Sequence, residues 1–223
     1  MSRIKEIYPN IYMINNQLAT LNSVKGFRPF SEKIENIAGK EYRFWDPRRS
    51  KAAAAIVKGI KEFPIKPGTK ILYLGAAHGY TCSFFSDIVG ANGIIYAVEF
   101  SERCFNELLP VAEKYKNVVP ILADARLPEQ YGWVEKVDVV YVDIAQPDQT
   151  EIAIRNCNAF LKKCGFLMLA VKTQSIDVTK SSKKVTEDEI KKLSSAGFSI
   201  ISWKMLEPFE EKHGFIVAQM PAR

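Results

Sequence analysis

Four charged side chains follow apolar runs of the chain, in positions where a parallel sheet would collect them. The run over residues 137–142 ends in Asp143, and Glu99, Asp124 and Lys172 close three further runs. A long run rich in β-branched residues is typical of a strand that is buried on both faces of a parallel sheet. Because ligands bind at the carboxyl ends of the strands in open α/β sheets, we expect these groups to share one edge and one site.

Glu99, Asp124 and Asp143, together with a turn of small residues before them, favour a cofactor that contains adenosine. The turn Gly75 to Gly79 follows the first run, and small residues there allow close approach of a ligand to the backbone. Glu99 follows about 20 residues later, where a carboxylate can accept hydrogen bonds from two ribose hydroxyls. Asp124 can accept one from an adenine amino group. Together with Asp143, these residues indicate either S-adenosylmethionine or a dinucleotide.

The remaining candidates would act on a substrate at the same edge. We expect Lys172, which closes the fifth run, to form an ion pair with Asp143 on the neighbouring strand. Lys51 lies on a helix that enters the domain and can reach the same cleft. His213 lies in the loop between the last two predicted strands and also faces this edge.

Alternating helix and strand patterns position these groups. We predict a mostly parallel sheet of seven strands, whose last two strands pair antiparallel. The first helix should begin with Asp46 as its N-cap and Pro47 in its first turn, and continue to Ile60. The predicted strands cover residues 70–74, 93–99, 118–123, 137–142, 166–172, 198–206 and 214–220. The later helices cover 81–89, 101–114, 148–161 and 186–196, and 173–184 is a predicted loop.

The first 45 residues have a different pattern. Short apolar runs over 11–14 and 17–21 flank Asn15 and Asn16, which predicts a β-hairpin. We therefore expect a small β-rich domain over residues 1–45 and a second, α/β domain over residues 46–223.

Composition narrows the class of protein. The chain has 223 residues, 47% of them hydrophobic, and a formal net charge of +6, which is compatible with an RNA partner. No apolar run approaches the roughly 20 residues that span a bilayer. The polar start Met1-Ser2-Arg3 and four scattered cysteines lead us to expect a cytoplasmic protein with reduced thiols and no metal site.

At this level of detail the chain resembles the fibrillarin family, in its archaeal form without a glycine- and arginine-rich N-terminal tail. The resemblance covers residues from about 40 to the C-terminus. It is carried by the segments 42–51, 72–77, 96–100, 122–126 and 137–149, and then by Lys172 and the segment 175–180.

The resemblance implies that the α/β sheet is of the Rossmann-like class I methyltransferase type and that residues 46–223 form an S-adenosylmethionine-dependent methyltransferase domain. It implies an RNA 2′-O-methyltransferase with a catalytic set Lys51, Asp143, Lys172 and His213. It implies cofactor contacts at Gly75, Ala76, Tyr80, Thr81, Glu99, Phe100, Asp124, Ala125, Asp143, Ile144, Ala145 and Gln146. Candidates for phosphate contact are Arg48, Arg49, Lys180, Lys183 and Lys184. The implied partners are a box C/D guide RNA with its target rRNA or tRNA, a Nop-type scaffold protein and a kink-turn-binding protein.

Two segments depart from the family pattern. His78-Gly79-Tyr80-Thr81 stands where Ser-Gly-Thr-Thr is usual, so that Tyr80 is expected where the methionine portion of the cofactor passes. Lys172-Thr173-Gln174-Ser175 stands where Lys-Ala-Arg-Ser is usual, which removes one basic residue from the RNA-facing loop.

The implied reaction is an in-line methyl transfer to a ribose 2′-oxygen. Lys172, held by Asp143, would stabilise the developing alkoxide as an ammonium or take the proton as an amine whose pKa Lys51 depresses. The residues leave three alternatives open. These are a guide-independent RNA methyltransferase, an NAD-dependent oxidoreductase and a non-catalytic assembly subunit.

Overall fold

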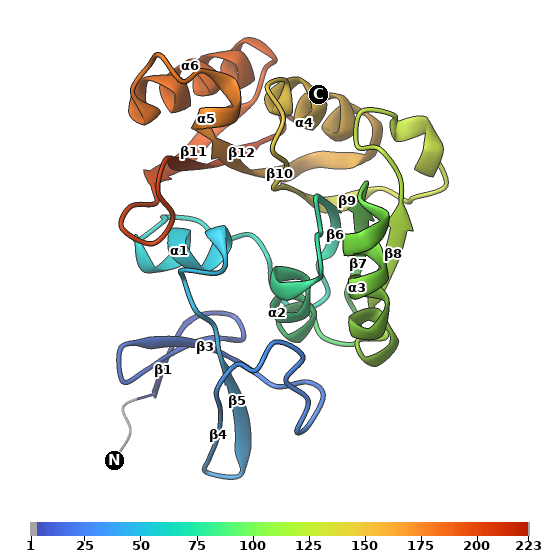
Figure 1. Ribbon diagram of the computed structural model, residues 1–223, viewed down its shortest axis with the longest axis vertical. Coiled ribbons are helices and arrows are strands. Elements are labelled where there is room, and N and C mark those ends of the chain that lie inside the picture. The colour runs from blue at the N-terminus through green and yellow to red at the C-terminus, as the bar shows by residue number, and fades with distance from the viewer. Residues whose placement is uncertain (1–3, 223) are drawn as a thin grey trace.

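The computed structural model describes residues 4–222, which form two separate β-sheets (Figure 1). The expectation drawn from Met1, Ser2 and Arg3 lies outside this range. The N-terminal sheet has the strand order β1-β2-β3-β5-β4 and is antiparallel throughout. Its strands are β1 (Ile4–Tyr8), β2 (Ile11–Ile14), β3 (Gln17–Leu21), β4 (Ile34–Ile37) and β5 (Lys40–Phe44). The predicted hairpin is confirmed: Asn15 and Asn16 both have positive φ, as a tight two-residue turn of this hand requires.

The second sheet has seven strands in the order β11-β12-β10-β9-β6-β7-β8. Its strands are β6 (Lys70–Leu74), β7 (Ile94–Glu99), β8 (Val118–Leu122), β9 (Val137–Val142), β10 (Leu161–Lys172), β11 (Ser199–Met205) and β12 (His213–Gln219). The first five are parallel to one another, and β12 runs antiparallel between β10 and β11. The predicted fold class is therefore confirmed.

Alternating side chains of the central strands fill two hydrophobic cores, one on each face of the sheet. On β9, Val139 and Tyr141 belong to one core, whereas Val140 and Val142 belong to the other. Both faces are covered by helices, so both sets of side chains are removed from water. This explains why the sequence of β9 is nearly continuous in apolar residues.

The helices follow the strands as the crossover pattern requires. They are α1 (Lys51–Val57), α2 (Tyr80–Val89), α3 (Glu102–Lys114), α4 (Gln149–Phe160), α5 (Thr173–Ile176) and α6 (Ser182–Ser195), with a 3-10 turn η1 (Pro128–Tyr131). Side chains of α1, α2 and α3 pack into the first core, and side chains of α4 and α6 pack into the second. Among the described residues, no helix is long and apolar enough to cross a membrane.

The predicted start of α1 was wrong. Asp46 does not cap the helix, because its carboxylate accepts hydrogen bonds from the backbone and guanidinium of Arg48. Ser50 is the N-cap, and its hydroxyl accepts from the backbone N–H of Ala53. The helix then ends at Val57, three residues before the predicted end at Ile60.

The predicted loop over 173–184 also contains more helix than expected. The short helix α5 occupies its beginning, and α6 starts at Ser182 rather than at residue 186. Ser181 caps α6 by accepting from the backbone N–H of Lys184.

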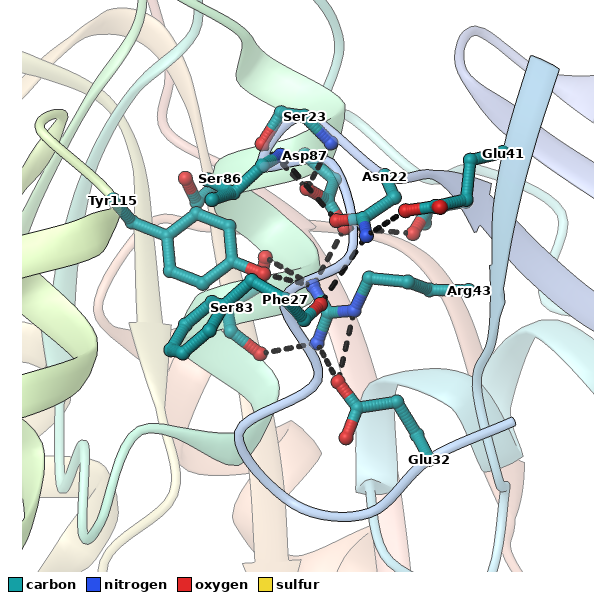
Figure 2. Close-up of polar contacts among 12 residues, drawn as sticks. Asn22, Ser23, Phe27, Glu32, Glu41, Arg43, Ser83, Ser86, Asp87 and Tyr115 are labelled. Carbon is teal, nitrogen blue, oxygen red and sulfur yellow. Dashed lines mark hydrogen bonds and ion pairs between the residues drawn. The ribbon is translucent and has the colours of Figure 1, made fainter. Parts of the chain in front are cut away.

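A buried arginine joins the two sheets (Figure 2). Arg43 on β5 is fully buried, and its guanidinium donates to Glu32 and to Asp87 on α2 at 2.6 and 2.7 Å. It also donates to the hydroxyls of Tyr115, at the end of α3, and of Ser83. These groups are buried away from bulk water. Losing Arg43 would therefore leave the carboxylates of Glu32 and Asp87 without a cation.

Apolar contacts continue this junction into the core. Trp45 stacks on Phe84 of α2 with ring centroids 5.1 Å apart, and it shares one hydrophobic core with Ile11 and Leu18 of the N-terminal sheet. The division of the chain at residues 45 and 46 therefore stays a proposal, since the two sheets do not have separate cores on this side.

We expect Arg43→Ala to lower the free energy of unfolding by about 3–5 kcal/mol, because it leaves Glu32 and Asp87 buried and unpaired. Chemical denaturation measures this. The matched control is Arg103→Ala, which removes an ion pair with Glu107 whose side chains are 89% and 53% exposed. Its expected cost is below about 1 kcal/mol. Equal costs for the two variants would contradict the structural role given to Arg43.

Candidate active site

A cleft opens at the carboxyl ends of β6, β7, β8 and β9, the edge that the sequence singled out. The residues that line it come from the loops after these four strands and from the start of α4. They are Gly75, Ala77, Val98, Glu99, Phe100, Ala123, Asp124, Ala125, Arg126, Asp143, Ile144, Ala145, Gln146 and Ile152. Eight of the predicted cofactor residues, besides Asp143, are in this set.

Gly75 lets the ends of β6 and β9 approach each other at the floor of the cleft. Its φ is +82°, and a Cβ built on it would lie 2.3 Å from the carbonyl oxygen of Asp143 and 2.9 Å from the side chain of Ile144. No other residue type fits there without moving the backbone. The position of Asp143 therefore depends on the absence of a side chain at Gly75.

The carboxylate of Glu99 is fixed at the rim of the cleft. One oxygen accepts from the backbone N–H of Ala77 and the other from the backbone N–H of Ser101, each at 2.8 Å. These bonds orient the carboxylate and leave further lone pairs for a ligand. Ala77, which has a positive φ of 49°, was missed as a contributor because its role is played by the backbone.

The neighbouring wall contains Asp124, Ala125 and an exposed aromatic ring. The carboxylate of Asp124 accepts from the backbone N–H of Arg126 at 2.8 Å. The Phe100 side chain is 73% exposed although it is large and apolar, and it lines the cleft. An exposed ring beside carboxylates provides a surface on which a planar base can stack.

Arg126 is a residue of the cleft that sequence reasoning missed. Its guanidinium donates to Gln146 at 2.6 Å and to the carboxylate of Asp148 at 3.1 and 3.3 Å. It thus ties the loop after β8 to the loop after β9. The signal was present in the segment 122–126, where an arginine follows Asp124 by two residues.

The side chain of Asp143 pairs with Lys51. The Lys51 Nζ lies 3.2 Å from Oδ1 of Asp143, and both side chains are 21% exposed. Burial lowers the pKa of Lys51, but the carboxylates of Asp143 and Glu210 outweigh it, so that this pKa is raised above its ordinary value. Lys51 is therefore a fixed cation at neutral pH. The stability that the pair contributes is present below the ordinary lysine pKa and is lost as pH rises through the raised value.

The predicted ion pair between Asp143 and Lys172 was wrong. Parallel pairing aligns Leu169 of β10 with Val142 of β9, so Ala170 is level with Asp143 and Lys172 lies two residues further along. Its side chain is exposed. Lys51, the first residue of α1, takes the place beside Asp143.

Lys172 is instead held through its backbone and faces His213. Its backbone N–H donates to the side chain of Gln149 at 3.1 Å, and the Gln149 amide donates back to the Lys172 carbonyl at 3.5 Å. Lys172 and His213 are paired directly across β10 and β12, a position in which side chains are about 5 Å apart at Cβ. Gln149, which is fully buried, was also missed as a positioning residue.

One ring nitrogen of His213 already has a hydrogen-bond partner. Its Nδ1 lies 2.7 Å from the backbone carbonyl oxygen of Glu211. A carbonyl only accepts, so Nδ1 is the nitrogen that carries the proton. In the neutral ring Nε2 then has a free lone pair and can accept a proton or a hydrogen bond.

Three predicted cofactor residues do not line the cleft. Ala76 is buried, Thr81 is directed to Ser50, and Tyr80 lies in a second cavity toward the N-terminal sheet. The Tyr80 hydroxyl accepts from the backbone N–H of Asp46, and the guanidinium of Arg49 lies 4.2 Å from the ring centroid. Tyr80 is thus turned away from the cleft that it was expected to narrow.

The five basic residues predicted for RNA differ in how far their charges are already paired. Arg48 pairs with Asp46, and Lys180 and Lys184 pair with Asp188. The guanidinium of Arg49 donates to the carbonyl of Phe30 and lies over the Tyr80 ring, and within the described residues it has no ion pair. Lys183 is exposed and forms no ion pair within residues 4–222. Arg49 and Lys183 are therefore the cations most available to a phosphate.

Comparison with known proteins agrees with this geometry. The fibrillarin family model matches residues 2–222. The chain belongs to the fibrillarin family. It is 46% identical to a fibrillarin-like rRNA/tRNA 2′-O-methyltransferase of Pyrococcus furiosus, over 97% of this chain and 98% of that protein.

Solved structures of fibrillarins superpose over nearly the whole chain. The Methanococcus jannaschii fibrillarin pre-rRNA processing protein has a TM-score of 0.95 and 44% identity, covering 100% of this chain and 99% of that one. Aeropyrum pernix fibrillarin in complex with natively bound S-adenosyl-L-methionine has a TM-score of 0.87 at 42% identity, covering 98% and 100%. The fibrillarin of a fibrillarin/Nop5p complex also has a TM-score of 0.87, at 40% identity, covering 96% and 99%.

We expect Gly75→Ala to destabilise this fibrillarin more than Gly68→Ala does. Both glycines have φ near +80°, but a Cβ at Gly68 meets nothing within 4 Å, whereas one at Gly75 collides with Asp143. Gly68→Ala therefore reports the backbone strain alone, about 1–2 kcal/mol. The collision should add about 1–3 kcal/mol in Gly75→Ala. Thermal or chemical denaturation measures the difference, and indistinguishable variants would contradict the close approach of β6 and β9.

Proposed function

We propose that this chain is the catalytic subunit of a box C/D guide-RNA ribonucleoprotein. As a fibrillarin it is an S-adenosylmethionine-dependent RNA 2′-O-methyltransferase. In the proposed complex it methylates the ribose 2′-hydroxyl of rRNA and tRNA at sites that the guide RNA selects. The observation that carries the proposal is that Asp143, paired with Lys51, lines a cleft whose residues suit an adenosine-containing cofactor, and that the neighbouring strand β10 ends in Lys172, which is paired across the sheet with His213.

The residues of the cleft fit S-adenosylmethionine. Gly75 leaves the floor free of side chains, and the fixed carboxylate of Glu99 suits a ribose diol. Asp124 can accept from an amino group, and Phe100 offers an exposed ring to the base. When bound, this cofactor supplies a methyl group on a positively charged sulfur.

The four catalytic residues prepare the 2′-hydroxyl, which is a poor nucleophile at neutral pH. Lys51 remains protonated beside Asp143 and holds that carboxylate in one orientation, so that its second oxygen can accept from the hydroxyl. Lys172 presents an exposed amine from a backbone that Gln149 fixes, and as an ammonium it stabilises the developing alkoxide. His213 accepts or relays the proton through Nε2.

The choice of the target nucleotide and the assembly on RNA are proposed to depend on partner RNA and proteins. RNA duplexes are recognised mainly by shape, by 2′-hydroxyls and by phosphates, so the choice of nucleotide falls to pairing between guide and target. Arg49 and Lys183 are proposed to contact phosphates, with Arg48, Lys180 and Lys184 exchanging their carboxylate partners for RNA. A related fibrillarin is known in a complex with Nop5p, which supports a Nop-type scaffold as one partner. A kink-turn-binding protein completes the proposed assembly, in the cytoplasm.

We expect Glu99→Gln to weaken binding of S-adenosylmethionine about tenfold to a hundredfold, because the charged acceptor at the rim is lost while its shape is kept. Calorimetric titration of the purified chain measures this. Glu102→Gln, three residues along the chain in the first turn of α3, is the control and should bind as the unaltered chain does. An unchanged dissociation constant in Glu99→Gln removes Glu99 from the cofactor site.

The guide-dependent role is tested by reconstitution of the chain with a box C/D guide RNA, a Nop-type scaffold and a kink-turn-binding protein. We expect methylation of one target ribose, and we expect the site to move when the guide sequence is changed. Lys172→Ala should abolish transfer and keep cofactor binding, whereas Lys163→Ala, at the other end of β10, should change neither. Methylation of free RNA at a guide-independent site would favour the alternative methyltransferase, and transfer by Lys172→Ala would overturn the role of Lys172.

A further inference from the structure

Two buried hydroxyls connect the helix that carries Lys51 with the helix that follows the cofactor turn. The Thr81 hydroxyl donates to the Ser50 hydroxyl at 3.0 Å. Ser50 is 2% exposed and Thr81 is 6% exposed, so the bond is shielded from water. A shielded bond of this kind costs more to break than a surface one, because water cannot take the place of the lost partner.

Ser50 and Thr81 lie at the starts of the two helices that adjoin the candidate site. Ser50 directly precedes Lys51 and is the N-cap of α1, accepting from the backbone N–H of Ala53. The helix α1 has only seven residues, and its first turn contains no acidic side chain. The orientation of that first turn, and hence of Lys51, depends on where the Ser50 hydroxyl is held. Thr81 is the second residue of α2, which begins after the turn from Gly75 to Gly79.

We propose that Thr81 and Ser50 are positioning residues, which hold Lys51 against Asp143 and couple the catalytic lysine to the cofactor turn. This inference rests on the proposed function, since it gives Lys51 a task in methyl transfer. It also reassigns Thr81, which family resemblance had suggested as a cofactor contact.

The hydrogen-bonding capacity of Thr81 supports the reassignment. The Thr81 hydroxyl is already engaged inside the protein, by the Ser50 hydroxyl at 3.0 Å and by a hydrogen bond with the buried Tyr73 side chain. Thr81 does not line the cleft in which Glu99 and Asp124 lie. Its influence on the cofactor would therefore act through the placement of α2 and not through a bond from its side chain.

The test compares Thr81→Val, which removes the hydroxyl and keeps the shape, with Thr81→Ser, which restores the hydroxyl. Three quantities are measured for the full chain: the pKa of Lys51 by NMR of labelled lysine side chains, the dissociation constant of S-adenosylmethionine, and kcat and KM in the reconstituted complex. Asp143→Asn is the reference for a Lys51 that has lost its partner. Thr20→Val removes another buried hydroxyl, which lies on β3 and donates to Asp87 near the C-terminal end of α2, far along that helix from Thr81. It controls for a general loss of stability.

We expect Thr81→Val to lower the pKa of Lys51 in the direction of Asp143→Asn and to lower kcat about tenfold to a hundredfold. The dissociation constant of the cofactor should stay within about twofold of that of the unaltered chain. Thr81→Ser should restore the pKa and kcat, and Thr20→Val should leave the pKa of Lys51 in place.

Other results overturn the inference. An unchanged pKa of Lys51 in Thr81→Val, whatever happens to kcat, means that the hydroxyl pair does not position this lysine. A cofactor dissociation constant raised more than tenfold returns Thr81 to the cofactor site. If the unaltered chain methylates no RNA, the proposed function fails. The pKa and the dissociation constant still decide whether Thr81 and Ser50 hold Lys51.

Discussion

The ion pair between Lys51 and Asp143 is the contact on which the candidate site depends. Its two members come from different parts of the fold, since Asp143 ends β9 in the middle of the sheet and Lys51 begins a helix that follows the N-terminal sheet. Asp143 is placed by the missing side chain at Gly75. Lys51 is placed by the cap at Ser50. The position of the Lys51 charge beside Asp143 therefore depends on how the N-terminal sheet is joined to the seven-stranded sheet.

Sequence patterns predicted the sheet well because its side chains obey a simple period. Alternate residues of β9 face opposite cores, and both cores are apolar, so the run from Val137 to Val142 could be assigned to a central strand. The carboxyl ends of parallel strands meet at one edge, which is why the sequence alone groups Glu99, Asp124 and Asp143.

Pairings that depend on register and on capping could not be predicted in this way. Lys172 was expected beside Asp143 because their strands are neighbours, but it lies two residues beyond the level of Asp143. Asp46 has the side chain of a good N-cap, yet Arg48 occupies its carboxylate and Ser50 takes that role. Ala77 acts through its backbone N–H, which leaves no trace in residue type. Gln149 acts through its side chain on the backbone of Lys172, a pairing that depends on how α4 packs beside β10.

The buried guanidinium of Arg43 has a consequence for how this molecule comes apart. Glu32, Asp87 and Tyr115 contribute to its shell from the N-terminal segment, from α2 and from the end of α3. Neither sheet can open without exposing these charged groups, so both should unfold in one cooperative transition. A fragment cut after residue 45 would expose the apolar surface that Trp45 and Phe84 share. We therefore expect the smaller sheet to unfold together with the larger one and not as a separate unit.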